Sequence, residues 1–382
     1  MRSVGLDLGK KEVSFCEVRD GKVVVRRTAR DVGQLDQLGP DTPPANVAIE
    51  ACREAWHVHD LLTANGHNVL LIDTTRVKRL GIGQHGRKND RIDAEVIARA
   101  VEENRIPRAH MLSRERRLLR EKLNVRRALI ETRASIITTI RGIVRARGEK
   151  LAPSDTDYFR RNLAKATLTD STRATLAPLS ATLDALDEQL SLLEPELEEL
   201  GAQEPIIATL TTAPGINLVV AAAFVAVIDS AKRFTNAHQV ESYIGLVPRE
   251  RTTGGADNRK LGAITKCGNP YLRAMLVQAA WCILRRRRQE DPLAAWGRQI
   301  AERRGKRIAV VALARRLAGV LWAMWRDGLP YDMGRVATAS ARGTERAALS
   351  AKDHAEAMRV IAHKANVRAG RVRARIVKEV SA

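Results

Sequence analysis

The sequence predicts an α/β domain at the N-terminus, followed by a long region that is mostly helical. Three observations support this prediction. Apolar, β-branched runs alternate with helix-like segments over the first hundred residues, leucines recur at helical spacing over residues 176–200, and apolar helices follow residue 205. With 382 residues, the chain is long enough for two or three domains with apolar cores.

Three short strands are predicted first, over Ser3–Leu8, Val13–Val18 and Lys22–Thr28. The turn Asp20-Gly21 joins the second strand to the third, so we expect an antiparallel meander. A helix-like segment follows the third strand.

The next elements complete the order of a known fold. A strand over Val47–Ala51, a helix over Arg53–Ala64, a strand over Asn68–Ile72 and a further helix are predicted. The order β-β-β-α-β-α-β-α is that of a ribonuclease-H-like domain, which we place at about residues 1–110.

Residues 111–204 are predicted to form a helical coiled-coil domain. One helix runs from 114 to about 150, and a second carries leucines spaced alternately three and four apart from Leu176 to Leu200. Pro195 lies off this seam and should bend the helix or mark a break near its end. The seam can pack within the chain as a helical hairpin or build a dimer, and both interpretations stay open.

A Pro-Gly turn opens the C-terminal domain, which we place at residues 205–335. Ala213-Pro214-Gly215-Ile216 precedes the apolar helix Leu218–Ile228, a pattern that resembles the helix-hairpin-helix. In that motif the turn offers backbone N–H groups to a phosphate. Pro-Gly turns also join helices that contact no DNA, so both roles remain open.

The rest of this domain is predicted to be helical after one long loop. A polar, Gly-rich loop runs from Arg249 to Gly268, and Asn269-Pro270 then begins a helix that reaches Arg285–Arg288. Another apolar helix covers Ile308–Trp325. Residues 336–382 lose apolar periodicity and are predicted to be a basic extension.

The charge points to a polyanionic partner. The chain has 65 Lys+Arg against 44 Asp+Glu, a formal net charge of +21. Nucleic acid fits this excess better than a membrane, because the longest uncharged apolar stretch, Leu218–Ile228, is too short to span a bilayer. No signal peptide precedes the first strand, and aromatic residues at 3% argue against a base-stacking platform.

The four cysteines show no paired metal-ligand spacing. We expect reduced, buried thiols in a cytosolic protein at Cys16, Cys52, Cys267 and Cys282.

Four acids are the candidate catalytic residues. Asp7 interrupts an apolar run in the first, central strand, and Glu50 ends the fourth strand beside it. Asp90 and Asp93 lie three apart at the start of a helix and so share one face. A carboxylate in an apolar strand is costly unless it is paired or binds a metal. The four together predict a divalent-metal site for phosphodiester chemistry.

Structural roles compete with this interpretation. Asp90 can cap its helix, Asp93 can serve as a first-turn acid favoured by the helix dipole, and Glu50 can be a surface residue. Asp7 is the hardest to explain in this way, because leucines flank it on both sides.

Six blocks stand in order along residues 1–330: Gly5-Leu6-Asp7-Leu8-Gly9-Lys10, Ile49-Glu50-Ala51-Cys52, Lys88-Asn89-Asp90-Arg91-Ile92-Asp93-Ala94, Ala213-Pro214-Gly215-Ile216, Tyr243-Ile244-Gly245-Leu246-Val247-Pro248 and Ile264-Thr265-Lys266-Cys267-Gly268-Asn269-Pro270-Tyr271-Leu272-Arg273. Together they resemble the DEDD transposases of bacterial insertion sequences. That family includes the Piv-type DNA invertases and the bridge-RNA-guided recombinases.

The resemblance implies a RuvC-like domain in which Asp7, Glu50, Asp90 and Asp93 hold Mg²⁺ beside the scissile phosphate. The chemistry agrees, because Mg²⁺ prefers hard oxygen ligands and neutralises charge that develops on phosphate oxygens.

The resemblance also implies a serine nucleophile in a Ser-Ser-Gly-Gly-like loop. The matching stretch here runs from Glu250 to Gly255 and places Thr253 at the nucleophile position. Threonine has the same hydroxyl, but its methyl is stiff and crowds an in-line approach. Three hypotheses stay open: a working Thr253 nucleophile, a weakened or inactive protein, and another nucleophile such as Ser242.

Nucleic-acid contacts are predicted at Lys10, Gly215, Arg251, Lys260, Lys266 and Arg273. The last three would clamp phosphate or stabilise the transition state. The resemblance further implies donor and target DNA, a structured guide RNA, a homodimer or tetramer, and a cytoplasmic, nucleoid-associated location without membrane contact.

Two other functions compete. Ribonuclease-H-like, ATP-dependent phosphotransferases also carry Asp-x-Gly after the first strand, as in Asp7-Leu8-Gly9, but no second phosphate loop or Gly-rich adenosine site follows in this sequence. The charge of +21 would also be unexplained. The other competitor is a non-catalytic, nucleic-acid-binding transposase relic, which the threonine at position 253 keeps open.

Overall fold

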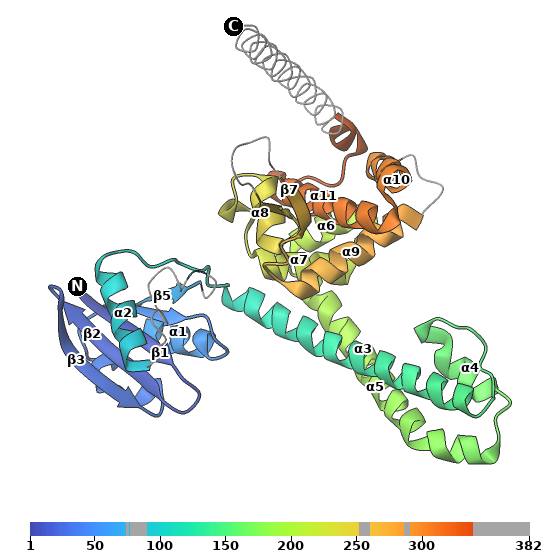
Figure 1. Ribbon diagram of the computed structural model, residues 1–382, viewed down its shortest axis with the longest axis horizontal. Helices are drawn as coiled ribbons and strands as arrows, with labels where there is room; N and C mark the ends of the chain where they lie inside the picture. The colour runs from blue at the N-terminus through green and yellow to red at the C-terminus, as the bar shows by residue number, and fades with distance from the viewer. Residues whose placement is uncertain (74–75, 77–89, 252–259, 286–290, 339–382) are drawn as a thin grey trace, which may run out of the picture. The chain divides into compact units, whose positions relative to one another are not determined.

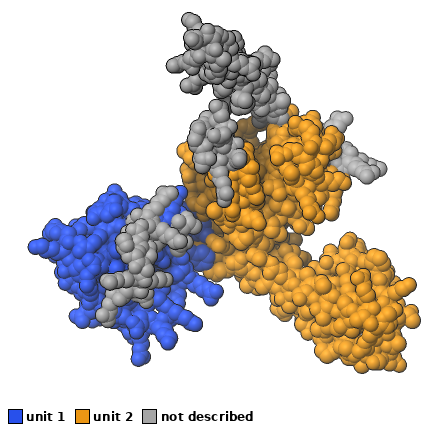
Figure 2. Space-filling view, in the orientation of Figure 1, with its two compact units in different colours: residues 1–112 blue, residues 113–382 orange. Residues whose placement is uncertain are grey.

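The computed structural model describes residues 1–73, 76, 90–251, 260–285 and 291–338. The chain divides into two compact units, Met1–Leu112 and Ser113–Ala382 (Figure 2). The finer division into four parts stays a prediction, and the proposed basic extension lies outside the described residues beyond 338.

A five-stranded mixed sheet in the order β3-β2-β1-β4-β5 forms the first unit (Figure 1). Its strands are β1 (Arg2–Leu8), β2 (Val13–Arg19), β3 (Lys22–Ala29), β4 (Ala45–Glu50) and β5 (Asn68–Ile72). β1 pairs antiparallel with β2 and parallel with β4, and β4 pairs parallel with β5. The predicted N-terminal α/β domain is confirmed, with β1 at the centre and β4 beside it.

Two helices supply the layers on either side of this sheet, α1 (Ala55–Ala64) and α2 (Asp90–Glu102). Successive side chains of a strand point to opposite faces, so each strand contributes to both layers. Leu6 of β1 belongs to the core cluster that contains Leu62 of α1. Ala48 of β4 belongs to a separate cluster with Ile97 of α2.

The connection between β3 and β4 corrects one prediction. Where the sequence predicted a helix-like segment, the structure has two short 3₁₀ turns, Val32–Gln34 and Asp36–Leu38. A longer helix has no room, because prolines follow at positions 40, 43 and 44 and proline interrupts a helix interior.

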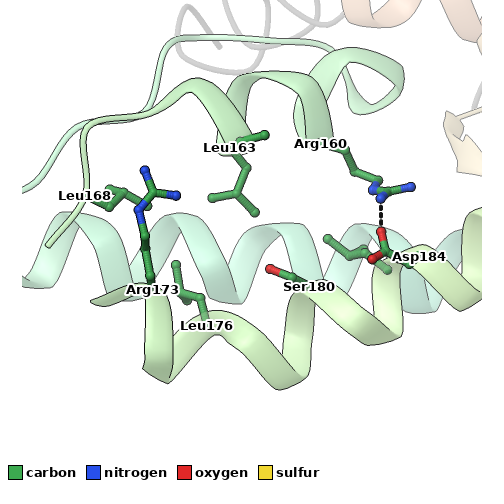
Figure 3. A pocket seen from close by; sticks show the side chains of 9 residues that line it. Arg160, Leu163, Leu168, Arg173, Leu176, Ser180 and Asp184 are labelled. Atoms are coloured by element: carbon green, nitrogen blue, oxygen red, sulfur yellow. Dashed lines mark ion pairs between the residues drawn. The ribbon is translucent and has the colours of Figure 1, made fainter. Parts of the chain in front are cut away.

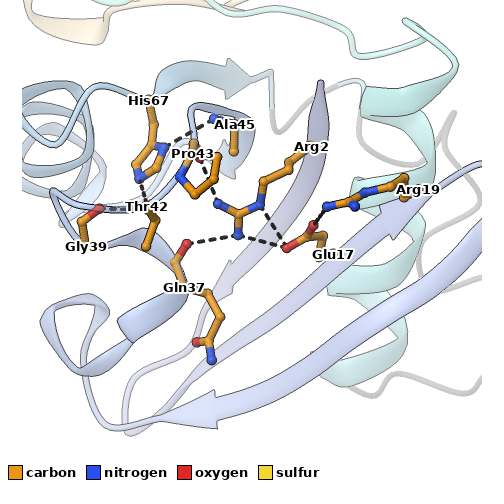
Figure 4. A network of polar contacts seen from close by, with 9 residues as sticks. All are labelled: Arg2, Glu17, Arg19, Gln37, Gly39, Thr42, Pro43, Ala45 and His67. Atoms are coloured by element: carbon orange, nitrogen blue, oxygen red, sulfur yellow. Dashed lines mark hydrogen bonds and ion pairs between the residues drawn. The ribbon is translucent and has the colours of Figure 1, made fainter.

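An ion-pair network fastens the start of β1 (Figure 4). Arg2 donates to Glu17 at 2.8 Å and to two main-chain carbonyls of the 37–43 segment at 2.9 Å each. Burial alone would raise the pKa of Glu17, but hydrogen bonds and charges from Arg2 and Arg19 prevail and lower it. His67 accepts a main-chain hydrogen bond from the start of β4 at 3.2 Å. These polar groups stabilise the end of the sheet opposite the predicted acids.

A helical hairpin begins the second unit, with α3 (Arg114–Ala146), α4 (Phe159–Lys165) and α5 (Asp170–Ala202). α3 and α5 pack along each other (Figure 1). The seam leucines that recur every seven residues are buried, namely Leu176, Leu183, Leu190 and Leu197. The seam therefore serves packing within the chain, and a coiled coil between subunits stays a prediction.

The proline in the seam helix does not break it. α5 continues through both Pro178 and Pro195 as far as Ala202, so a break at Pro195 is wrong, whereas the alternative of a bend there stays a prediction. α4 and α5 border a pocket of about 210 Å³, whose lining includes leucines and an Arg160–Asp184 ion pair (Figure 3).

The remaining helices surround a second, larger core. They are α6 (Pro205–Thr211), α7 (Leu218–Ile228), α8 (Ala237–Ile244), α9 (Pro270–Arg285), α10 (Pro292–Arg304) and α11 (Lys306–Asp327). α11 is the one described helix that is long and apolar enough to cross a membrane. It packs against α6, α8, α9 and α10, and Arg315 and Arg316 lie near its middle. These contacts are those of a core helix.

Several elements of this unit, α8 among them, were not predicted from the sequence, and one expectation about cysteines was wrong. The predicted loop over 249–268 contains the hairpin of β6 (Pro248–Arg251) and β7 (Lys260–Ile264), and α10 was not predicted. Cys16 is buried as expected, whereas the other three cysteines are exposed.

Candidate functional site

Asp7 and Glu50 lie at neighbouring strand ends. The parallel pairing of β1 with β4 extends to Leu6 and Ile49, and each acid is the next residue along its strand. The carboxyl ends of parallel strands meet at one edge of a sheet. Ala48 packs on the α2 side, and Glu50, two residues later, returns to the same face. Gly5 of β1 lies with its Cα against α2. Asp7 is two residues later on the same strand, so its side chain lies on the same face of the sheet.

The direction of α2 brings its first turn to the same edge. Near its C-terminal end, Arg99 donates to the carbonyl of Gly21 at 2.8 Å, and Glu102 accepts from the Gly21 N–H at 3.1 Å. Gly21 lies in the β2–β3 turn, at the amino end of β1, because β2 runs antiparallel to β1. The N-terminus of α2 therefore lies towards the carboxyl ends of β1 and β4.

Asp93 is buried on the side of α2 that faces β4. Its exposed fraction is 4%, and Ile97, one turn later, packs against Ala48. Asp93 lies one helical turn before Ile97, and this turn lies towards the end of β4 that carries Glu50. Asp90 is the first residue of α2, and its side chain lies outside the described part of the structure.

Gly5 makes this arrangement of helix and strand achievable. A Cβ at this position would lie 2.2 Å from the carbonyl oxygen of Ala94 and 2.5 Å from the N–H nitrogen of Ala98. The backbone of α2 therefore rests directly on β1. In the sequence Gly5 is part of the motif around Asp7, but its close contact with the backbone of α2 could not be predicted from that motif.

Ser14 is a second residue that sequence analysis missed. It pairs with Asp7 across the β1–β2 ladder and is only 4% exposed. Directly opposed residues on antiparallel strands share one face, so Ser14 belongs to the same layer as Asp7. A polar residue within the apolar stretch Val13-Ser14-Phe15-Cys16 was the available signal.

The acids have the right chemistry for a hard cation, but the three whose side chains are described do not form a compact cage. Among the described residues, no three His, Cys, Asp or Glu side chains come together as a metal site. Asp90, the fourth predicted ligand, is not included in that comparison because its side chain is not described. The topology thus places Asp7, Glu50 and Asp93 on one face near one edge, and their joint coordination of an ion remains a proposal.

In the second unit, two distant sequence blocks pack backbone against backbone. A Cβ on Gly245 would lie 2.2 Å from the carbonyl oxygen of Cys267, and one on Gly268 would lie 2.1 Å from that of Tyr243. Both glycines have positive φ, +80° and +122°. Only glycine fits these positions, and their contact holds the start of β6 and the end of β7 in place.

Replacing Gly245 with Ala should therefore destabilise the second unit by about 2 kcal/mol or more, through both the clash and the left-handed backbone. Thermal unfolding of the full chain should show a melting temperature several degrees lower. Gly305→Ala is the control, because Gly305 has φ +84° but open space around its Cα. Equal losses in the two variants would show that the close contact contributes nothing.

The remaining predicted contact residues fall into three groups. Lys10 and Lys266 are exposed, as a phosphate contact requires. Gly215 is explained by packing, because a Cβ there would lie 2.7 Å from the carbonyl oxygen of Ala279. Arg273 donates through Nη1 to the carbonyls of Ile244 at 2.9 Å and Gly268 at 3.0 Å, so it supports the block that holds the hairpin.

The predicted nucleophile lies in sequence between the strands of this hairpin. Arg251 ends β6 and pairs with Lys260 at the start of β7, but their side chains are not described. Thr253 lies outside the described residues. Ser242, the alternative nucleophile, is exposed on α8.

Two protein-family models match parts of this chain. Residues 207–294 match the family model described as "Transposase IS116/IS110/IS902 family", and residues 4–146 match the DEDD model of IS110 elements, described as "Transposase".

Several curated relatives align over most of their length. A "Probable family 20 transposase" of Pseudomonas aeruginosa is 29% identical, covering 87% of this chain and 98% of that protein. The "Transposase for insertion sequence element IS1111A" of Coxiella burnetii is 27% identical, with coverages of 87% and 92%. The corresponding transposase of element IS1328 from Yersinia enterocolitica is 28% identical, with coverages of 86% and 98%.

The two matched models describe the sheet unit that carries Asp7, Glu50 and Asp93, and the helical unit that carries the Pro-Gly turn and the Gly-Leu-Val-Pro block. The chain belongs to the DEDD transposase family of bacterial insertion sequences and is a DNA transposase.

Proposed function

We propose that this transposase cuts and rejoins DNA with Mg²⁺ held by Asp7, Glu50, Asp90 and Asp93. The observation that carries the proposal is the convergence of elements at one edge of the sheet. Two parallel strands end there in acids, and the first turn of α2 brings the buried Asp93 to the same face. A buried carboxylate needs such a partner or cation to offset the cost of desolvation.

Each group would have a defined task. A Mg²⁺ ion would neutralise charge on the nonbridging and leaving oxygens of the scissile phosphate. Asp7 and Glu50 would supply oxygen ligands from the rigid sheet, and Asp93 one from the helix. The positive end of the α2 dipole would favour the ionised form of acids in its first turn. Ser14, beside Asp7, would orient that carboxylate by hydrogen bonding.

We further propose Thr253 as the nucleophile. Its hydroxyl oxygen would form a bond to the phosphorus and give its proton to solvent, and the bond to the leaving oxygen of the DNA strand would break, with that oxygen taking a proton from solvent. The cut strand would then stay attached to the protein as a phosphothreonine ester. The support is the match of Glu250–Gly255 to the family's nucleophile loop and the hydroxyl chemistry that threonine shares with serine.

The adduct can be trapped and mapped. After incubation with Mg²⁺, donor DNA and the element's noncoding RNA, denatured wild-type protein should carry DNA on a peptide that contains Thr253. Thr253→Ala should yield no adduct, whereas Thr253→Ser should yield at least as much, because serine lacks the crowding methyl. An adduct that persists in Thr253→Ala but disappears in Ser242→Ala would reject Thr253 in favour of the alternative.

Guide RNA, subunit number and cellular location complete the proposal. By family resemblance, a structured noncoding RNA would pair with donor and target DNA, and two or four subunits would assemble in the cytoplasm at the nucleoid. The positive charge suits RNA and DNA equally. Recombination of a plasmid pair that requires the element's noncoding RNA would support guidance by RNA.

A catalytically weakened relic is the second candidate function, and the threonine at position 253 is the observation that favours it. The trapping experiment separates the two, because a relic would bind DNA and form no adduct with any variant.

A further inference from the structure

A groove in the second unit carries an unusual concentration of arginine. It lies between the β6–β7 hairpin and helices α10 and α11, and its volume is about 1150 Å³. We call it the arginine groove and define it by Leu261, Ile264, Arg303, Arg304, Arg307 and Ile308. Arg315 and Arg316 of α11 also line it.

Three of these arginines have charge available for a partner. Arg303, Arg304 and Arg307 are exposed and, within the described part of the chain, form no ion pair. Arg315 differs, because its Nε donates to Glu241 at 2.5 Å and ties α11 to α8. Arg316 differs as well, since its guanidinium stacks over the Trp296 ring at 4.7 Å. Arg303 donates through Nε to the carbonyl of Gln299 at 3.3 Å, which leaves the rest of its guanidinium for a partner. The groove thus has an inner wall of engaged arginines and an exposed cationic rim.

The start of α11 reinforces this rim. α10 ends at Arg304, Gly305 forms the junction, and α11 begins at Lys306. No described side chain caps the N-terminus of α11. The first N–H groups of this 22-residue helix therefore point, with the positive end of its dipole, to the place where the three arginines gather.

The rest of the groove is apolar and open. Leu261 of β7 is 60% exposed and Ile308 of α11 is 46% exposed. Together with Ile264 they provide a surface on which sugar rings and bases can pack. A cationic rim beside an apolar floor suits a nucleic-acid strand, whose phosphates are anionic and whose sugars and bases are not.

We propose that the arginine groove holds a strand of the DNA substrate, with phosphates on Arg303, Arg304 and Arg307 and sugars or bases on Leu261 and Ile308. The choice of DNA rests on the proposed function, because one wall of the groove is the hairpin whose strands flank Thr253 in sequence. A strand held there would lie against the hairpin whose connecting segment contains the proposed nucleophile in sequence.

The test is equilibrium binding of the full chain to fluorescent DNA and RNA oligonucleotides, measured by anisotropy in EDTA. The groove variant is Arg303→Gln/Arg304→Gln/Arg307→Gln. Its control, Arg145→Gln/Arg161→Gln/Lys165→Gln, removes three exposed charges from the helical hairpin, so both variants lose the same net charge. Unfolding curves should show that both variants remain folded.

The groove variant should bind DNA at least tenfold more weakly than the control. Its slope of log affinity against log salt should also fall by about 2 to 3, because each phosphate contact contributes about 0.7 to 0.9 to that slope. Leu261→Ser should weaken DNA binding without changing the slope, since it removes no charge.

Equal DNA affinity of the groove variant and the control would overturn the proposal, as would a loss confined to RNA. Because the assay contains no Mg²⁺ and needs no strand cleavage, a failure of the metal site or of Thr253 would leave the binding result unchanged. The two proposals can therefore fail separately.

Discussion

Asp7→Asn should reduce DNA strand cleavage and rejoining by at least about 1,000-fold, which corresponds to about 4 kcal/mol in the barrier. Asparagine keeps the size of the side chain but removes the negative charge that would hold Mg²⁺. Asp93→Asn should have an effect of the same order, because it removes the ligand supplied by α2. Plasmid recombination and single-turnover cleavage would measure both variants.

A matched substitution at the other end of the sheet supplies the control. Asp20 lies in the β2–β3 turn with φ +52°, a backbone conformation that asparagine tolerates. Asp20→Asn should leave both activity and the melting temperature unchanged. Full activity in Asp7→Asn would remove this residue from the catalytic site, and unfolding of that variant would show that the carboxylate serves the fold.

Gly5→Val should abolish the native packing of the first unit. The added side chain would overlap the α2 backbone, where even a methyl group would lie 2.2 Å from a carbonyl oxygen. Neither partner can move by a side-chain rotation, so we expect a loss of about 4 kcal/mol or more. Loss of near-ultraviolet circular dichroism and exposure of the first unit to limited proteolysis would report it.

Gly39→Ala is the companion variant for this experiment. The nearest atom to a Cβ at Gly39 would be 3.5 Å away, an ordinary contact, and φ is −70°. This variant should unfold like wild type. If Gly5→Val did the same, the close approach of α2 to β1 would be wrong, and with it the position assigned to Asp93.

The sequence predicted the positions of strands and helices best where apolar residues recurred with a single clear spacing. The alternation in residues 3–28 located β1, β2 and β3 within a few residues, and the leucine spacing located α5. The short hairpin was missed because Lys260-Leu261-Gly262-Ala263-Ile264 is brief and shows no clear alternation. The 3₁₀ turns after β3 were mistaken for a helix because their apolar residues recur three apart, at 32, 35 and 38.

The candidate site, too, could be predicted from the sequence only in part. Asp7 stood out in the sequence because leucines flank it, whereas the pair Asp90 and Asp93 suited a helix cap equally well. Only the structure shows that Asp93 is buried and lies towards β4. The arginine groove was not predicted, because its walls come from residues 241–248 and 261–264 and from helices that begin at 292 and 306.

Binding of Mn²⁺, followed by electron paramagnetic resonance and displaced with Mg²⁺, tests most directly whether the acids of the first unit act together on one ion. Wild-type protein and the Asp20→Asn variant should bind Mn²⁺ in a form that Mg²⁺ displaces. Asp7→Asn and Asp93→Asn should each lose most of that binding while staying folded. Undiminished Mn²⁺ binding in both of these variants would contradict the metal site on which the proposed mechanism depends.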